Sequence, residues 1–242
     1  MSSSPVSSRI TSMGATMAPI ITFMQEAKWA QHNTEPDISD FTFGNPHDNP
    51  LDSYVTAVQK TLTPQNKDWF AYKQSVPEAQ AVIAETISDY LGHTFYEQDI
   101  CITNGAFAGL NVVIKTIVDV GDEIIFISPH WFAYEGMIIS AGGKAVNISI
   151  DPDTFNLDLE AIKNAISPRT RGIIINTPHN PTGKIYDRET LTQLATILEE
   201  ASQKNGRTVY LISDEAYHQI IFEGNQFVSP ATIYPNSFLV YT

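Results

Sequence analysis

The sequence predicts an α/β fold in three layers, in which a mainly parallel β-sheet is flanked by helices. Short runs rich in β-branched and aromatic residues recur along the chain, and segments with helical spacing of apolar residues separate them. This alternation is typical of parallel βαβ units, whose sheet is buried on both faces. The length of 242 residues and the hydrophobic content of 43% are sufficient for one large core.

The expected strands and helices alternate through the second half of the chain. The strands are DICITN (99–104), DEIIFIS (122–128), KAVNISI (144–150), TRGIIIN (170–176), TVYLISD (208–214) and SFLVYT (237–242). The helices between them are GAFAGLNVVIKTIV (105–118), HWFAYEGMIISAGG (130–143), LDLEAIKNAI (157–166) and DRETLTQLATILEEASQKNG (187–206). Gly206 is placed as the C-cap of the last of these helices.

The first part of the chain is expected to lie outside this alternating core. Helical spacing also marks residues 54–62 and 77–92, and FTFGNPHDNP (41–50) is rich in turn-forming residues. The first twenty residues are rich in Ser, contain no acid and have Arg9 as their only basic residue, which favours a flexible arm. We therefore divide the chain into an N-terminal arm or small-domain segment, 1–40, and a large domain, 41–242.

Composition excludes several classes of function. The formal charge of −13 repels nucleic acid and anionic membrane surfaces, and no apolar run reaches the ~20 residues of a membrane span. Cys101 is the only cysteine, which excludes an internal disulfide and favours a reducing compartment, the cytoplasm. The histidines show no metal-ligand spacing, and the chain has neither a G-x-S-x-G nucleophile elbow nor a Walker loop, so we expect no metal site.

Polar residues follow two of the expected strands where each strand ends. NTPHNPTG (176–183) contains Asn180, and LISDEAYHQIIF (211–222) contains Asp214 and Tyr217. Considered alone, Asp214 is typical of a helix N-cap, and Asn180 is typical of a turn residue before proline. Because the carboxyl ends of parallel strands open into one crevice, the three side chains are expected to converge. A carboxylate, an amide and a phenol together suit an aromatic heterocycle with a ring nitrogen and a ring hydroxyl.

NTPHNPTG together with SDEAYHQIIF resembles the fold-type I pyridoxal-phosphate enzymes, particularly the class I/II aminotransferases, and the resemblance covers roughly residues 40–242. It implies that residues 41–242 form the domain that binds pyridoxal 5'-phosphate (PLP). It also implies that Asp214 pairs with the protonated pyridine nitrogen of PLP, so that the ring can accept electrons from the substrate. Asn180 and Tyr217 would bond the phenolic oxygen of the ring.

Two further strand ends match the same family. The turn TNGAFAGL (103–110) implies that Gly105, Ala106 and Phe107 supply backbone N–H groups to the cofactor phosphate at a helix N-terminus. In SPHWFAYEG (128–136), Trp131 matches the aromatic residue that lies against the face of the pyridine ring. Ordinary packing of a small-residue turn and an aromatic cluster of the core are the alternatives.

The resemblance implies a second subunit and a substrate contact. Tyr72 resembles the tyrosine that reaches the phosphate in the neighbouring subunit, which implies a homodimer, although the family's usual Gly near Ser75 or Val76 is missing. Gly44 resembles the loop whose backbone N–H meets the substrate carboxylate, and a plain turn is its alternative.

The reaction implied is the transfer of an amino group between an amino acid and a 2-keto acid. The alternatives are a PLP-dependent C–S lyase or other fold-type I enzyme, and a noncatalytic α/β binding module. The family places its Schiff-base lysine beyond SFLVYT, so we expect this chain to lack that residue and to be inactive alone. The lysines present lie in the Asn180 loop or in arms, helices and other turns: Lys28, Lys60, Lys67, Lys73, Lys115, Lys144, Lys163, Lys184 and Lys204.

Overall fold

In the described residues, a parallel sheet of five strands forms the centre of an α/β unit built from the second half of the chain. The computed structural model describes residues 5–32, 35–39, 41–42, 44, 48–222 and 224–242. Every strand pairing is parallel, and the order across the sheet is β2-β1-β3-β4-β5. The strands are β1 (Glu123–Ser128), β2 (Lys144–Ser149), β3 (Thr170–Asn176), β4 (Tyr210–Asp214) and β5 (Ser237–Val240). The order reverses direction between β1 and β3, which is where open α/β sheets form ligand crevices.

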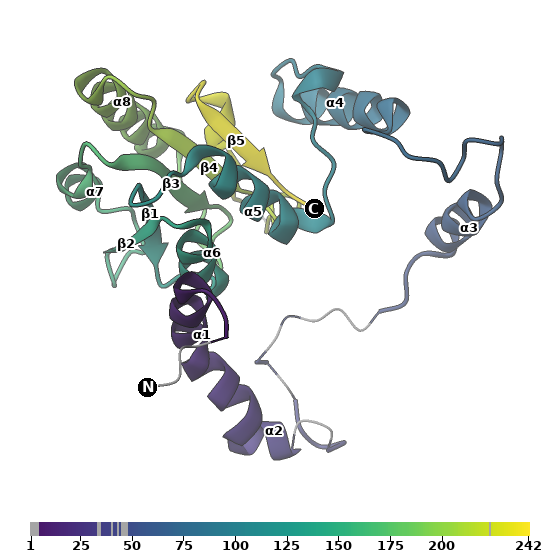
Figure 1. Cartoon of the computed structure of the whole chain (residues 1–242), viewed down its shortest axis with the longest axis horizontal. Coiled ribbons are helices and arrows are strands. Elements are labelled where there is room, and N and C mark those ends of the chain that lie inside the picture. The colour runs from purple at the N-terminus through teal and green to yellow at the C-terminus, as the bar shows by residue number, and fades with distance from the viewer. Residues whose placement is uncertain (1–4, 33–34, 40, 43, 45–47, 223) are drawn as a thin grey trace.

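Helices cover both faces of this sheet, as Figure 1 shows. They are α5 (Gly105–Ile117), α6 (Ala133–Ala141), α7 (Leu159–Ala165) and α8 (Arg188–Asn205). The other helices lie outside these layers: α1 (Ser8–Glu26), α2 (Lys28–His32), α3 (Asp52–Thr61), α4 (Pro77–Leu91) and the short 3-10 helices η1 (Glu97–Asp99) and η2 (Pro230–Thr232). In Figure 1, α3 lies well apart from the sheet. Among the described residues, none of the helices combines the length and the apolar character that crossing a membrane requires.

The strand residues alternate between two separate hydrophobic cores. Ile125, Ile173 and Leu211 pack with α7 and α8 in one core, whereas Ile124 and Ile174 pack with α5 and α6 in the other. Successive side chains of a strand point to opposite faces, so apolar residues at consecutive positions fill both cores. The near-continuous apolar runs of the sequence are therefore explained by a sheet that is buried on both sides.

Two expectations about local structure are wrong. Residues 8–20 do not form a flexible arm, because α1 begins at Ser8 with the side chain of Ser7 as its N-cap and packs on α6. A Cβ on Gly136 of α6 would lie 3.3 Å from Cγ of Met13, so the small residue allows the two helices to approach closely. The helix continues through Pro19 while it contacts α6, although none of its residues is fully buried.

The second error concerns residues 99–104, which are not a strand. Asp99 ends η1, and the residues that follow have no neighbouring strand in the described part of the sheet. The side chain of Gln80 in α4 instead donates a hydrogen bond to the backbone oxygen of Ile100 at 2.6 Å. The β-branched residues of this segment therefore lack the strand partner that would make them extended.

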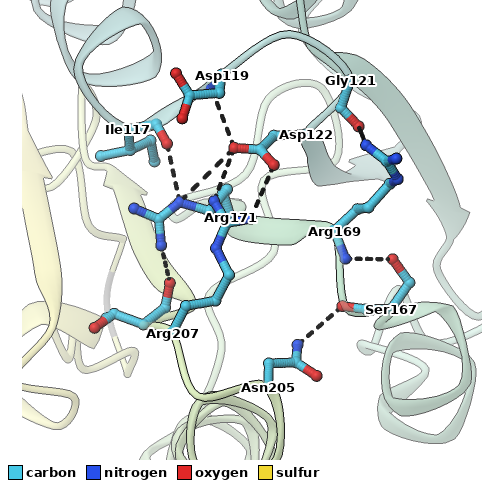
Figure 2. A network of polar contacts seen from close by, with 10 residues as sticks. Ile117, Asp119, Gly121, Asp122, Ser167, Arg169, Arg171, Asn205 and Arg207 are labelled. Atoms are coloured by element: carbon cyan, nitrogen blue, oxygen red, sulfur yellow. Dashed lines mark hydrogen bonds and ion pairs between the residues drawn. The ribbon is translucent and has the colours of Figure 1, made fainter.

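An ionic network joins the segments at the amino ends of the strands (Figure 2). Arg207 donates to both carboxylate oxygens of Asp122, at 3.0 and 2.9 Å, and the backbone N–H of Asp119 donates to the same carboxylate at 3.0 Å. Arg171 donates to the backbone oxygens of Ile117 and Thr208. Burial raises the pKa of Asp122, but the hydrogen bonds from Arg207 and Asp119 outweigh it and hold that pKa below its usual range.

Replacing Arg207 with alanine is expected to lower the free energy of unfolding by about 1–2 kcal/mol, because Asp122 would keep its buried carboxylate and lose a bidentate partner. The effect stays modest because the Arg207 side chain is 35% exposed and the pair is partly screened. Urea denaturation at neutral pH measures it. Lys163→Ala, which removes an exposed ion pair of 3.8 Å with Glu200, is the control and should change stability by less than about 0.5 kcal/mol. Equal effects of the two variants would contradict a special role for the network.

Candidate functional site

Polar side chains gather at the carboxyl ends of β1, β3 and β4, beside the first turn of α5. Asn176 and Asp214 are the last residues of β3 and β4 and are direct partners in the parallel register. Asp214 is also level with Val240 of β5, whose backbone oxygen accepts a hydrogen bond from the N–H of Glu215 at 2.8 Å. The register of the sheet therefore places the starts of the loops that follow β3 and β4 side by side.

Asp214 is a buried carboxylate whose neighbours are neutral or acidic. Its side chain accepts a hydrogen bond at Oδ2 from the hydroxyl of Tyr134, and at Oδ1 from the N–H of Ala216 at 3.4 Å. Burial raises the pKa of Asp214, and the Tyr134 hydroxyl partly opposes that rise. No basic side chain in the described parts of the chain forms an ion pair with it. A buried carboxylate without a cation favours a ligand that carries a proton or a positive charge.

Asn176 connects the loops that follow β3 and β4, and the sequence analysis did not single it out. Its Nδ2 donates to the backbone oxygen of Asp214 at 2.9 Å, and its Oδ1 accepts from the backbone N–H of Asn180 at 2.6 Å. The side chain is buried, so both halves of its amide are used inside the protein. The positions of Asn180 and Asp214 are therefore coupled through one side chain.

The structure brings Asn180 and Tyr217 together. Nδ2 of Asn180 donates to the Tyr217 hydroxyl at 3.2 Å, although 37 positions separate the two residues. Tyr217 is 39% exposed, so part of this residue is open to a ligand. This amide and phenol pair can contact an oxygen of a planar molecule whose charged nitrogen meets Asp214.

Aromatic rings line another side of the site. Trp131, in the loop after β1, meets Phe107 edge to face with ring centroids 5.5 Å apart, and it meets Tyr134 in the same manner at 5.6 Å. Phe107 is 55% exposed, and Trp131 is partly buried against the α5 and α6 core. Trp131 thus lies between the first turn of α5 and the tyrosine that contacts Asp214.

The first turn of α5 can accommodate an anion. Gly105 has φ +75°, a left-handed conformation that other L residues rarely adopt, and it leads directly into the helix. The side chain of Asn104 makes no capping hydrogen bond, so the backbone N–H groups of Ala106 and Phe107 have no acceptor within the helix. These groups and the helix dipole favour negative charge at this position.

Two predicted residues lie away from this cluster. Tyr72 is fully exposed, between α3 and α4, and its side chain touches none of the residues above. Gly44 is exposed, and a Cβ built on it would have no neighbour within 4 Å.

Lys184, the lysine of the Asn180 loop, points to the backbone oxygen of Thr154 at 3.2 Å rather than to Asp214. In the portion of the chain that the structure describes, no three His, Cys, Asp or Glu side chains are grouped for a metal ion.

Glu215 is a second buried acid, and its environment differs from that of Asp214. Its Oε1 accepts hydrogen bonds from the hydroxyls of Ser213 and Ser229, both at 2.6 Å. It lines a cavity of about 90 Å³ together with Tyr90 of α4, His218 and Tyr241. Burial raises the pKa of Glu215 to about 7; the two serine hydrogen bonds oppose this rise and the charge of Asp214 adds to it.

Comparison with known proteins identifies relatives for most of the chain. Residues 36–242 match the family model described as aminotransferase class I and II. A probable aspartate/prephenate aminotransferase of Thermus aquaticus is 34% identical over 82% of this chain and 50% of its own length. Human kynurenine--oxoglutarate transaminase 1 is 28% identical over 83% of the chain and 49% of its own length. The chain spans about half the length of the curated relatives it matches.

Solved structures give the same result for the fold. The crystal structure of the aspartate aminotransferase from Rhizobium meliloti superposes with a TM-score of 0.82 at 26% identity, covering 99% of this chain and 59% of that one. The aspartate aminotransferase of Thermus thermophilus with maleate gives a TM-score of 0.80 at 27% identity, covering 99% and 60%. The three-layer α/β fold predicted from the sequence is confirmed.

Proposed function

The chain belongs to the class I and II aminotransferases, and on this premise we propose that it binds PLP at the carboxyl ends of β1, β3 and β4. We propose further that the protein moves an amino group between an amino acid and a 2-keto acid. The observation that carries the proposal is the buried Asp214 carboxylate, which lacks a cation among the described residues and lies at the open end of the sheet. A protonated ring nitrogen would supply the missing charge.

The donor set at this end of the sheet fits the parts of PLP. Asp214 would hold the ring nitrogen, Asn180 and Tyr217 the ring hydroxyl, and Trp131 a face of the ring. The phosphate would lie at the first turn of α5, beside Gly105 and at the N–H groups of Ala106 and Phe107. The N–H of Gly105 itself donates to the backbone oxygen of Thr103 at 2.9 Å, a bond that a phosphate would have to share or replace. When bound, PLP supplies an aldehyde that condenses with amines and an aromatic ring that withdraws electrons from the adjacent carbon.

The residues of this chain have separate tasks in that chemistry. The charged form of Asp214 keeps a proton on the ring nitrogen, and the burial of its carboxylate keeps water from competing for that proton. The Asn180 and Tyr217 pair donates to the ring oxygen and fixes the ring in its plane. Trp131 and the first turn of α5 prevent rotation and departure of the bound molecule.

The remaining site assignments are proposals about the complete assembly. Tyr72 would reach the cofactor phosphate of a second copy in a homodimer, which its full exposure allows. Gly44 would meet the substrate carboxylate through its backbone N–H. We also propose residues 41–242 as the PLP-binding large domain and 1–40 as a small-domain segment, in a protein of the cytoplasm with no nucleic-acid or membrane partner.

Quenching of tryptophan fluorescence tests the location of the site. The chain contains Trp29, Trp69 and Trp131, and of these we place Trp131 in contact with the cofactor. Titration of the purified 242-residue chain with PLP is expected to quench fluorescence saturably, and Trp131→Phe should remove most of that change. Trp69→Phe, which alters a half-buried residue between α3 and α4, is the control and should retain it. No saturable quenching in the unaltered chain, or equal loss in both variants, would refute the proposed site.

A further inference from the structure

Tyr134 contacts the acid on which the proposed function depends. It lies in the first turn of α6, is 2% exposed, and directs its hydroxyl to Oδ2 of Asp214 across 80 positions of sequence. The ring of Trp131 meets it edge to face at 5.6 Å, and the ring of His130 stacks on it at 6.5 Å. Its ring belongs to the α5 and α6 core, but its hydroxyl belongs to the site.

The hydroxyl of Tyr134 favours the charged form of Asp214. Burial raises the pKa of Asp214 and thereby favours the neutral acid, whereas hydrogen bonds from Tyr134 and Ala216 favour the carboxylate. The pKa of Tyr134 itself is raised well above its usual value, by burial and by the charge of Asp214, so the phenol stays protonated and remains a donor. The other titratable groups around this pair are Tyr217, Glu215 and His130, and none of them supplies a positive charge to Asp214.

We propose that Tyr134 is a positioning residue that keeps Asp214 charged and correctly oriented for the ring nitrogen of the cofactor. The inference rests on the proposed function, because it concerns the acid that would meet PLP. Tyr134 does not touch the reacting atoms and acts through Asp214. The residue was not predicted from the sequence, because an aromatic residue in WFAYEG is equally typical of a core.

Tyr186 provides a matched comparison within the same protein. It is 1% exposed and belongs to a hydrophobic core, but its hydroxyl has no hydrogen-bond partner among the described residues. Removing either hydroxyl makes the same chemical change, from tyrosine to phenylalanine, at the same degree of burial. A purely structural role of Tyr134 would make the two variants alike in their effect on Asp214.

The first measurement concerns Asp214 in the protein without cofactor. The carboxyl carbons of aspartate are labelled with ¹³C and titrated by NMR, and the Asp214 signal is assigned by its loss in Asp214→Asn. Tyr134→Phe is expected to move the midpoint of Asp214 upward by about one pH unit, since a hydrogen bond to a charged group changes an equilibrium about tenfold or more. Tyr186→Phe should leave the midpoint unchanged. Incorporation of 3-fluorotyrosine at position 134, a stronger donor of nearly the same size, should move it downward.

The second measurement is PLP affinity as a function of pH. In Tyr134→Phe, the loss of affinity on acidification should begin about one pH unit higher than in the unaltered chain, and at the original midpoint affinity should be about fivefold weaker. An unchanged Asp214 midpoint in both the Phe and the 3-fluorotyrosine proteins would overturn the inference. If instead the midpoint moves as expected but no form of the chain binds PLP, the proposed function fails and the link between Tyr134 and Asp214 stands.

Discussion

Replacing Asp214 with asparagine is expected to weaken PLP binding to this chain by about 100-fold or more at neutral pH. The amide has the size of the carboxyl group and can still accept the Tyr134 hydrogen bond, so the substitution removes little besides the charge. Loss of one partner of a buried ion pair costs about 3–5 kcal/mol, and each 1.4 kcal/mol is a factor of ten in affinity. Absorbance or fluorescence titration with PLP measures the change. In a preparation with transaminase activity, Asp214→Ala should nearly abolish transamination while sparing the fold.

The control for this prediction is another acid at the surface. Asp153→Asn makes the same chemical change at an exposed position between β2 and α7, and it should leave PLP affinity within about twofold of the original. The protein without cofactor should be no less stable after Asp214→Asn, because a buried, unpaired charge is removed. Similar affinities of the unaltered chain and the Asp214 variant would show that the ring nitrogen binds elsewhere.

Glu215→Gln is expected to raise the stability of the cofactor-free chain by about 3 kcal/mol at pH 8 and to change it little at pH 5. Burial raises the pKa of Glu215 from an ordinary value of 4.5 to about 7 in the folded protein. Each pH unit between the two values corresponds to about 1.4 kcal/mol. Glutamine keeps an oxygen that can accept both serine hydrogen bonds, and it has no charge to bury.

The raised pKa of Glu215 determines the direction in which stability changes with pH. Because the folded form binds the Glu215 proton more tightly than the unfolded form, stability is greatest below about pH 4.5 for this group and is lost as pH rises toward 7. The raised pKa of Asp214 also makes stability fall as pH rises, and it does so equally in the unaltered chain and in Glu215→Gln. The lowered pKa of Asp122 has the opposite effect, because it makes stability fall as pH drops at more acidic pH. Urea denaturation at pH 5 and pH 8 measures the difference. Glu199→Gln, an exposed change in α8, should show no such dependence, and a pH-independent effect of Glu215→Gln would contradict the argument.

The central strands β1, β3 and β4 could be predicted because they contain apolar residues at consecutive positions and both faces of the sheet are covered. The convergence of Asn180, Asp214 and Tyr217 could also be predicted, since parallel strands place their carboxyl ends together. Residues 99–104 have the same composition as the true strands, but composition does not reveal whether a neighbouring strand is present. The helix at Ser8 was missed for a related reason, because its contacts with α6 are made with residues more than 100 positions away and no local pattern reveals them.

Side chains that support other side chains were the hardest to predict. Asn176 and Tyr134 act through Asp214, and their patterns in the sequence are those of a strand end and a core aromatic residue. The Arg207 to Asp122 pair spans 85 positions and follows no short motif. Tyr72 and Gly44 are the opposite case, since the sequence pattern predicts roles for them that contacts within one chain do not test.

The side-chain amide of Asn176 affects the entropy of ligand binding, because it connects two loops of the site before a ligand binds. Because it accepts from the backbone N–H of Asn180 and donates to the backbone oxygen of Asp214, the two loops lose their freedom when the chain folds and not when a ligand arrives. The two loops therefore lose their conformational entropy during folding. Binding then costs only the entropy that the ligand itself loses when it is immobilised. A site of this kind should bind with a small heat-capacity change for its size, as expected for a rigid receptor.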